Sequence, residues 1–135
     1  MIKDSGNRTE FESGFVRDIQ EGKGRMDLLP WYAIIDLSKH CEEGAKKYGE
    51  HNIDKGAPMH SLLSSGSRHL AEFMLGIDDE DHLRAAAWNI MWALNQRYTH
   101  PEQDDRFVKS TGGENATLHN VTENGIRGEN EMASS

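Results

Sequence analysis

Large apolar side chains are confined to the middle of this 135-residue chain, where they recur at helical spacing. All three Trp and all three Tyr residues lie between positions 26 and 98. Apolar residues every three to four positions are typical of amphipathic helices, whereas half-buried strands alternate apolar and polar residues. No segment shows sustained alternation. The chain is therefore expected to be all-α, with a single modest core.

The apolar spacing predicts three main helices, and Pro and Gly residues mark their ends. Pro30 suits the first turn of a helix over residues 30–48, and Gly49 suits its C-terminal cap. Two further helices are expected over residues 61–75 and 80–98. Together they predict a small helical bundle.

The residues expected to face the core share this helical spacing. In chain order they are Ile34, Leu37, Cys41, Ala45, Tyr48, Leu63, Leu70, Phe73, Met74, Leu83, Ala86, Ala87, Ile90, Met91 and Leu94. Asp78 or Asp79 is expected to cap the third helix. Three short helices leave a broad apolar face, with Trp88 and Trp92 one turn apart beside it. We therefore expect a homodimer or a higher homo-oligomer.

Both ends of the chain are polar. Residues 1–27 are Gly-rich and charged, which favours an extended N-terminal arm. From residue 108 to 135 the chain is mostly Gly, Asn, Glu, Ser and Thr, a composition that buries too little to offset its ordering entropy, and we expect a disordered tail over residues 101–135. The helical domain is thus predicted over residues 28–100.

The formal charge of −8 argues against stable binding of duplex nucleic acid, which needs a basic face. The charge does not exclude a nucleotide, because acidic proteins recruit divalent cations when they handle phosphates. No stretch approaches the length of a membrane span and no signal peptide is recognisable, so a cytoplasmic location is expected. The lone Cys41 excludes an internal disulfide framework and a cysteine-based zinc site.

Paired acids and lysines follow one another on the first helix. Glu42 and Glu43 stand four residues before Lys46 and Lys47. One interpretation is two intrahelical ion pairs on a solvated face. The other is that the carboxylates bind a metal ion while the lysines contact phosphate.

The second helix carries Arg68, His69 and Glu72 within about one turn. His69 at the edge of the apolar face is either a structural histidine or part of a site. The guanidinium of Arg68 suits a two-pronged contact with phosphate. Glu72 is either a metal ligand or simply the ion-pair partner of Arg68.

Four acids precede a histidine at the start of the third helix, in the run Asp78-Asp79-Glu80-Asp81-His82. Capping and the helix dipole explain one or two of them. Four exceed what capping requires, so a divalent-cation role is a plausible interpretation. Asn89 stands seven residues after His82 on the same face, where it either joins helices or contacts a base.

Short motifs across much of the chain together resemble one family. They are Glu12-Ser13-Gly14-Phe15-Val16-Arg17-Asp18, Gly22-Lys23-Gly24-Arg25-Met26-Asp27-Leu28-Leu29-Pro30, Gly44-Ala45-Lys46-Lys47-Tyr48-Gly49, Asn52, Lys55-Gly56, Arg68-His69, Asp79-Glu80-Asp81-His82-Leu83 and Trp88-Asn89. Their combination resembles the bacteriophage dATP/dGTP diphosphohydrolases, the MazZ-type relatives of the all-α MazG nucleotide pyrophosphohydrolases. The resemblance covers about residues 10–98.

The resemblance implies hydrolysis of a purine deoxynucleoside triphosphate between its α and β phosphates. The products would be the monophosphate and pyrophosphate, with Mg²⁺ or Mn²⁺ as cofactor. Such an enzyme acts in phage nucleotide metabolism in the host cytoplasm. In phages that replace adenine with 2-aminoadenine, it supplies dGMP and removes dATP.

The sequence departs from the wider superfamily at the metal-binding motifs. MazG enzymes carry Glu-Glu-x-x-Glu on one helix and Glu-x-x-Asp on the next. Here Glu42-Glu43 is followed by Lys46, and the second motif reads Ala86-x-x-Asn89. The metal site is therefore either rearranged or absent.

The expected metal ligands are all carboxylates. Glu43 and Asp81 lead, and the further candidates are Glu42, Glu72 and Asp79. The cations expected to neutralise phosphate charge are Lys46, Lys47 and Arg68. His69 or His82 would relay a proton or anchor a carboxylate.

The remaining candidates concern substrate recognition. Those expected at the base and sugar are Tyr48, Asn52 and Asn89. The arm residues expected to close over the phosphates, in their own or a neighbouring subunit, are Arg17, Lys23 and Arg25.

Two other functions stay open at this stage. A non-catalytic phage protein that binds a nucleotide or a host factor would explain the missing second acidic motif. A triphosphohydrolase would release inorganic triphosphate and a nucleoside, which product analysis distinguishes from a monophosphate.

Overall fold

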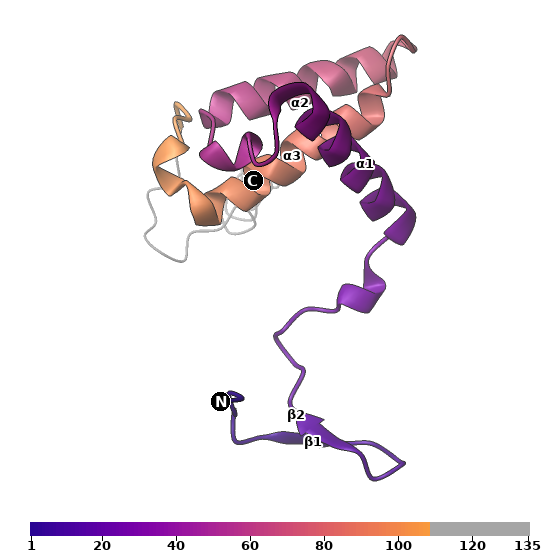
Figure 1. The fold of residues 1–135 in the computed structure, drawn as a ribbon, viewed down its shortest axis with the longest axis vertical. Helices are drawn as coiled ribbons and strands as arrows, with labels where there is room; N and C mark the ends of the chain where they lie inside the picture. The colour runs from indigo at the N-terminus through magenta and orange to yellow at the C-terminus, as the bar shows by residue number, and fades with distance from the viewer. Residues whose placement is uncertain (109–135) are drawn as a thin grey trace, which may run out of the picture. The chain divides into compact units, whose positions relative to one another are not determined.

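The computed structural model describes residues 1–108 and divides into two units, Met1–Lys39 and the part from His40 onward. The helical prediction is confirmed: the described residues form three main helices, α1 (Trp31–Tyr48), α2 (Met59–Met74) and α3 (His82–Thr99) (Figure 1). Their bounds lie within two residues of those predicted from the apolar spacing.

A glycine ends α1, and an aspartate caps the start of α3. Gly49 follows α1 with a φ of 94°, and its N–H donates to the carbonyl of Ala45 at 2.8 Å. At α3 the predicted cap was wrong. Asp81, rather than Asp78 or Asp79, caps the helix, and its carboxylate accepts the N–H of Arg84 at 3.0 Å.

The N-terminal unit contains a small antiparallel hairpin that the sequence analysis missed. Its strands are β1 (Arg8–Glu10) and β2 (Val16–Asp18), and η1 (Met26–Leu28) is a short 3₁₀ helix after them. Asp18 holds the preceding segment by accepting the N–H of Ser5 at 3.1 Å. Strands of three residues are too short to show a recognisable alternation, so periodicity alone could not reveal them.

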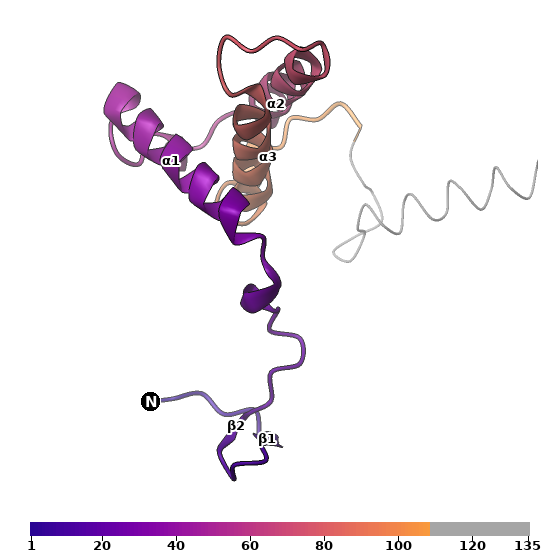
Figure 2. The same ribbon diagram turned by 90° about the vertical axis from the view of Figure 1, so that its right-hand side faces the viewer.

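Helices α2 and α3 run antiparallel and pack against each other along a shared seam (Figures 1 and 2). The buried residues of this seam are Met59, Leu62, Gly66, His69, His82, Ala85, Ala86, Asn89, Ala93 and Gln96. Gly66 permits the close approach, because a Cβ there would stand 3.1 Å from Ile90 Cδ1 and 3.2 Å from Asn89 Cβ.

The predicted core was wrong for seven large side chains, which are 47–76% exposed in the single chain. They are Tyr48, Leu70, Phe73, Met74, Leu83, Ile90 and Leu94. The seam buries Met59 and Leu62 together with small and polar residues instead, and the seven large groups stay exposed. A homo-oligomer that covers these groups stays a prediction.

The end of the seam farthest from the α2–α3 turn is closed by a glutamine. Gln96, which is buried, donates from Nε2 to the carbonyl of Ala57 at 2.8 Å and accepts the N–H of Ala57 at 2.9 Å. Met59, Leu62 and Ala93 form the apolar cluster beside it. This side chain therefore fixes the segment that follows η2 (Ile53–Lys55).

Replacing Gln96 with alanine is expected to lower the free energy of unfolding by about 1–2 kcal/mol, because both backbone groups of Ala57 lose their partner. Urea denaturation would measure the change. Asn95→Ala, at the exposed neighbouring position, is the matched control and should leave stability within about 0.5 kcal/mol. An equal effect of the two substitutions would contradict this role of Gln96.

His100 joins the end of α3 to the same loop. Its Nε2 donates to the carbonyl of Asp54 at 2.7 Å, and its Nδ1 lies 3.0 Å from Glu102. The hydrogen bond to the Asp54 carbonyl, followed by that to Glu102, raises the pKa of His100 above its usual value. Protonated His100 therefore stabilises the fold.

This raised pKa predicts a pH-dependent contribution to stability. The contribution is fully present below the unfolded pKa of about 6.5 and is lost as pH rises through the folded pKa. The stability difference between the parent protein and His100→Gln should thus be larger at pH 5.5 than at pH 8.5. Thermal denaturation at both values measures it, and a difference that grows with pH would reverse the sign.

The described chain continues past the predicted start of the tail at residue 101. Pro101–Gln103 form the 3₁₀ helix η3, and Asp105 accepts the N–H of His60 at 2.9 Å. The folded part thus extends beyond the expected boundary because these residues pack back on the start of α2. The rest of the predicted tail, residues 109–135, lies outside the described residues.

Within the described part of the chain, none of the helices combines the length and the apolarity that crossing a bilayer requires.

Candidate metal centre

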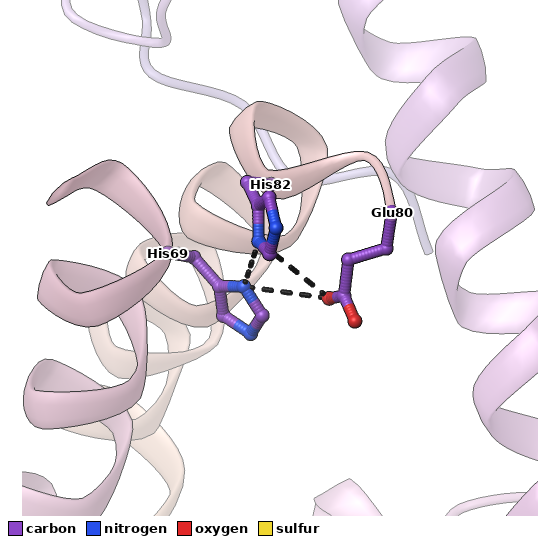
Figure 3. Close-up of side chains that lie close together, drawn as sticks. All are labelled: His69, Glu80 and His82. Carbon is purple, nitrogen blue, oxygen red and sulfur yellow. Dashed lines mark hydrogen bonds and ion pairs between the residues drawn. The ribbon is translucent and has the colours of Figure 1, made fainter. Parts of the chain in front are cut away.

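Two buried histidines face one another at the turn between α2 and α3 (Figure 3). His69 comes from the C-terminal part of α2, and His82 is the first residue of α3. They are 9% and 3% exposed, and their Nδ1 atoms lie 2.9 Å apart. Two ring nitrogens so close together require either a shared proton or a cation between them.

Carboxylates complete this group. Glu72 Oε2 lies 2.8 Å from His82 Nδ1, and Glu80 Oε1 lies 3.4 Å from His69 Nδ1. The ligand atoms of His69, Glu80 and His82 all lie within 4.8 Å of one another. We call His69, Glu72, Glu80 and His82 the histidine–carboxylate cluster.

A further carboxylate, that of Asp79, contacts the other ring nitrogen of His82. Asp79 Oδ1 lies 2.6 Å from His82 Nε2, the nitrogen that points away from His69. This hydrogen bond holds the pKa of Asp79 below its usual value. This contact fixes the orientation of the His82 ring, so that Nδ1 is the nitrogen directed at His69 and Glu72.

Local sequence explains why these groups converge. His69 and Glu72 are three residues apart, so they share one face of α2. The chain then reverses through Gly76, whose φ is 79°, and the Asp81 cap starts α3 at His82. The antiparallel return brings His82 opposite His69.

A second polar network lies on the other side of α3. Arg84 donates from Nη2 to Glu43 at 2.6 Å and from Nε to His40 Nδ1 at 3.2 Å. Burial, followed by the nearby Arg84 charge, lowers the pKa of His40. His40 is therefore neutral at pH 7 and can accept this hydrogen bond.

Five residues proposed from the sequence meet in or beside the cluster: Arg68, His69, Glu72, Asp79 and His82. Glu80 was missed as a ligand, although the acidic run that contains it was noted. Within such a run, periodicity cannot decide which carboxylate turns inward. Arg84 was also missed, since nothing in its sequence context marks it.

The other expected metal ligands have partners elsewhere. Glu42 forms an ion pair with Lys46 at 3.8 Å, one of the two intrahelical pairs that their spacing allowed. Glu43 pairs with Arg84 instead of Lys47. The Asp81 carboxylate serves as the α3 cap.

In the second unit, most of the side chains expected to contact the phosphates or the base are exposed. Arg68 Nη1 lies 3.4 Å from Glu72, at the edge of the cluster. Lys47 lies 5.0 Å from the ring centroid of Tyr48. Their roles toward a substrate stay predictions.

The two asparagines differ in their surroundings. Asn52 is exposed in the loop after α1, and its Oδ1 lies 3.4 Å from Lys55 Nζ. Asn89 is buried in the seam, where its amide donates to the carbonyl of Ala85 at 2.8 Å. One N–H of the Asn89 side-chain amide is thus hydrogen-bonded within α3 itself.

The three arm cations belong to the N-terminal unit. Lys23 lies 3.6 Å from Asp18, and Arg25 forms two hydrogen bonds with Asp27 at 2.8 and 2.7 Å. Arg17 stands 5.9 Å from the ring centroid of Phe15. Their expected contact with phosphates stays a prediction.

The helical fold and the histidine–carboxylate cluster define a small α-helical protein with a candidate centre for a divalent cation. A family model described as "dATP/dGTP diphosphohydrolase, N-terminal" matches residues 14–106. This chain belongs to that family, because the match covers well over half of its length. No curated protein and no solved structure matches the chain significantly.

The family confirms the resemblance found in the sequence. Its name points to an enzyme of the diphosphohydrolase type and to a nucleotide substrate.

Proposed function

We propose that this protein hydrolyses purine deoxynucleoside triphosphates, dATP or dGTP, to the monophosphate and pyrophosphate in phage nucleotide metabolism. The family match over residues 14–106 supports the reaction and the substrate class. The convergence of two buried histidines and two carboxylates supports dependence on a divalent ion, Mg²⁺ or Mn²⁺.

The reaction adds water across the α–β phosphoanhydride. One phosphorus–oxygen bond forms with the water oxygen and the bridging bond breaks, so pyrophosphate leaves and the water proton passes to a base. A divalent ion, when bound, would neutralise phosphate charge and lower the pKa of a water molecule. His69, Glu72, Glu80 and His82 would hold that ion.

Other residues would orient a ligand of the ion or neutralise the charge of the phosphates. Asp79 holds His82 in one orientation through its Nε2. Arg68 stands at the rim of the cluster, where its guanidinium suits a phosphate oxygen once it leaves Glu72. Lys46, Lys47 and the arm cations remain candidates for the other phosphates.

The decisive experiment incubates purified protein with each of the four dNTPs and Mg²⁺ or Mn²⁺, and resolves the products by chromatography. We expect monophosphate and pyrophosphate from dATP or dGTP, and no reaction after chelation. Nucleoside with inorganic triphosphate would instead identify a triphosphohydrolase. No turnover from folded protein would favour a non-catalytic protein that binds a nucleotide or a host factor.

Three substitutions distinguish the cluster from the carboxylates first expected to bind the metal: Glu80→Gln within the cluster, and Glu43→Ala and Asp81→Ala outside it. Glu43→Ala and Asp81→Ala remove groups that the structure places on Arg84 and at the α3 cap. Loss of turnover in Glu80→Gln but retention in Glu43→Ala would support the cluster. The reverse pattern would favour the acidic set on α1.

A further inference from the structure

The histidine–carboxylate cluster brings four electron-donating atoms together. His82 Nδ1 lies 2.9 Å from His69 Nδ1, 2.8 Å from Glu72 Oε2 and 3.9 Å from Glu80 Oε1. His69 Nδ1 lies 3.8 Å from Glu72 Oε2 and 3.4 Å from Glu80 Oε1. Figure 3 shows His69, Glu80 and His82 converging on one region.

The cluster is rich in electron-pair donors. The carboxylates of Glu72 and Glu80 offer acceptor oxygens, and these oxygens lie 2.8–3.9 Å from the Nδ1 atoms of the two histidines. His82 Nε2 is engaged by Asp79 at 2.6 Å, so Nδ1 is the nitrogen that His82 directs at the cluster. A divalent cation can accept electron pairs from both ring nitrogens and from carboxylate oxygens.

The spacing suits an ion with short metal–ligand bonds. At metal–nitrogen and metal–oxygen distances of about 2.1 Å, neighbouring ligand atoms lie about 3.0–3.4 Å apart in octahedral or tetrahedral sites. The five separations that join a histidine Nδ1 to another ligand atom of the cluster, 2.8–3.9 Å, bracket these values. Calcium needs longer bonds and more oxygen ligands, so it fits poorly.

The chemistry of the donors then selects among small divalent ions. Mg²⁺ favours oxygen ligands and retains its waters, whereas imidazole nitrogen suits first-row transition metals. The hydrogen bond of Asp79 to the far nitrogen of His82 is the arrangement that metal-binding histidines usually show. Burial of both histidines favours a resident ion over casual surface binding.

We propose that His69, Glu72, Glu80 and His82 form a site selective for a first-row transition-metal ion over Mg²⁺. The inference deepens the proposed function, since it specifies the cofactor of the same cluster. Affinity should rise from Mn²⁺ to Co²⁺, as expected for nitrogen and oxygen ligands. Of the two ions expected from the sequence, Mn²⁺ is thus the one this site prefers.

The test titrates chelator-treated, full-length protein with Co²⁺ and follows its visible absorption, with Mg²⁺ as competitor. We expect one Co²⁺ per chain, at an affinity at least about tenfold above that for Mg²⁺. A hundredfold excess of Mg²⁺ should leave the Co²⁺ bands largely unchanged. Equal affinity for the two ions would overturn the inference.

Variants locate the ion. His69→Gln and Glu80→Gln should each weaken Co²⁺ binding at least about tenfold. Glu80 is 56% exposed, so its substitution tests the site even where loss of the buried His69 disturbs folding. The matched controls are His51→Gln, an exposed loop histidine, and Asp78→Asn, an acid outside the cluster; both should bind Co²⁺ as the parent does. Parent-like binding in His69→Gln and Glu80→Gln would overturn the proposal.

The metal site and the reaction fail in different ways. Co²⁺ binding that depends on His69, without turnover of any dNTP, would refute the proposed hydrolysis and support the site. Turnover with Mg²⁺ that survives His69→Gln, in protein that binds no Co²⁺, would refute the site and leave hydrolysis standing.

Discussion

Replacing His82 with glutamine is expected to reduce hydrolysis of dATP or dGTP at least about 100-fold. His82 Nδ1 lies 2.9 Å from His69 Nδ1 and 2.8 Å from Glu72 Oε2, and its Nε2 lies 2.6 Å from Asp79 Oδ1, so both ring nitrogens of His82 are engaged. An amide in its place presents no imidazole lone pair. Steady-state product formation with Mn²⁺ measures the loss.

The control for this substitution is His51→Gln, which changes an exposed histidine in the same unit. It should retain the parent rate. The helical circular-dichroism signal of both variants should match the parent, which separates lost chemistry from lost fold. A folded His82→Gln protein with parental turnover would remove the cluster from the reaction.

The second large effect is expected at Gly66. Leucine there is expected to lower the free energy of unfolding by about 2–3 kcal/mol, because the seam has no room for a side chain. A Cβ alone would already stand 3.1 Å from Ile90 and 3.2 Å from Asn89. Since Gly66 lies one turn before His69, separation of the helices should also weaken Co²⁺ binding.

Gly44→Ala in α1 is the matched control. A Cβ at Gly44 meets nothing within 4 Å, so the helix gains propensity without a clash and stability should rise by up to about 1 kcal/mol. Urea denaturation of both variants tests the contrast. Similar effects at Gly44 and Gly66 would show that close approach of α2 and α3 does not limit stability.

The helices were predictable because their determinants are local. Apolar spacing and the Gly49 and Gly76 stops depend on neighbours in the chain, and the structure places both glycines just past their helices with positive φ. The core was less predictable. Spacing indicates that a helix has an apolar face, but Gly66, Ala85 and Ala93 show that helix packing can bury a different face.

The candidate site shows the same limit. Sequence reasoning selected His69, Glu72, Asp79 and His82 but also Asp81, and it missed Glu80. The carboxylate that turns toward His69 and the one that caps α3 belong to adjacent residues, Glu80 and Asp81. That difference depends on backbone dihedrals at the turn, which residue types alone do not specify.

The sequence by itself determined the helical class, the approximate bounds of three helices, the family resemblance and the presence of a histidine at each side of the α2–α3 turn. These features follow from side-chain periodicity and short motifs, which act over one or two helical turns. Only the tertiary structure decided that His69 and His82 face each other, that Glu80 joins them and that Glu43 pairs with Arg84. The antiparallel register of α2 and α3 and the position of the Asp81 cap set those contacts, because they bring together side chains that are distant along the chain.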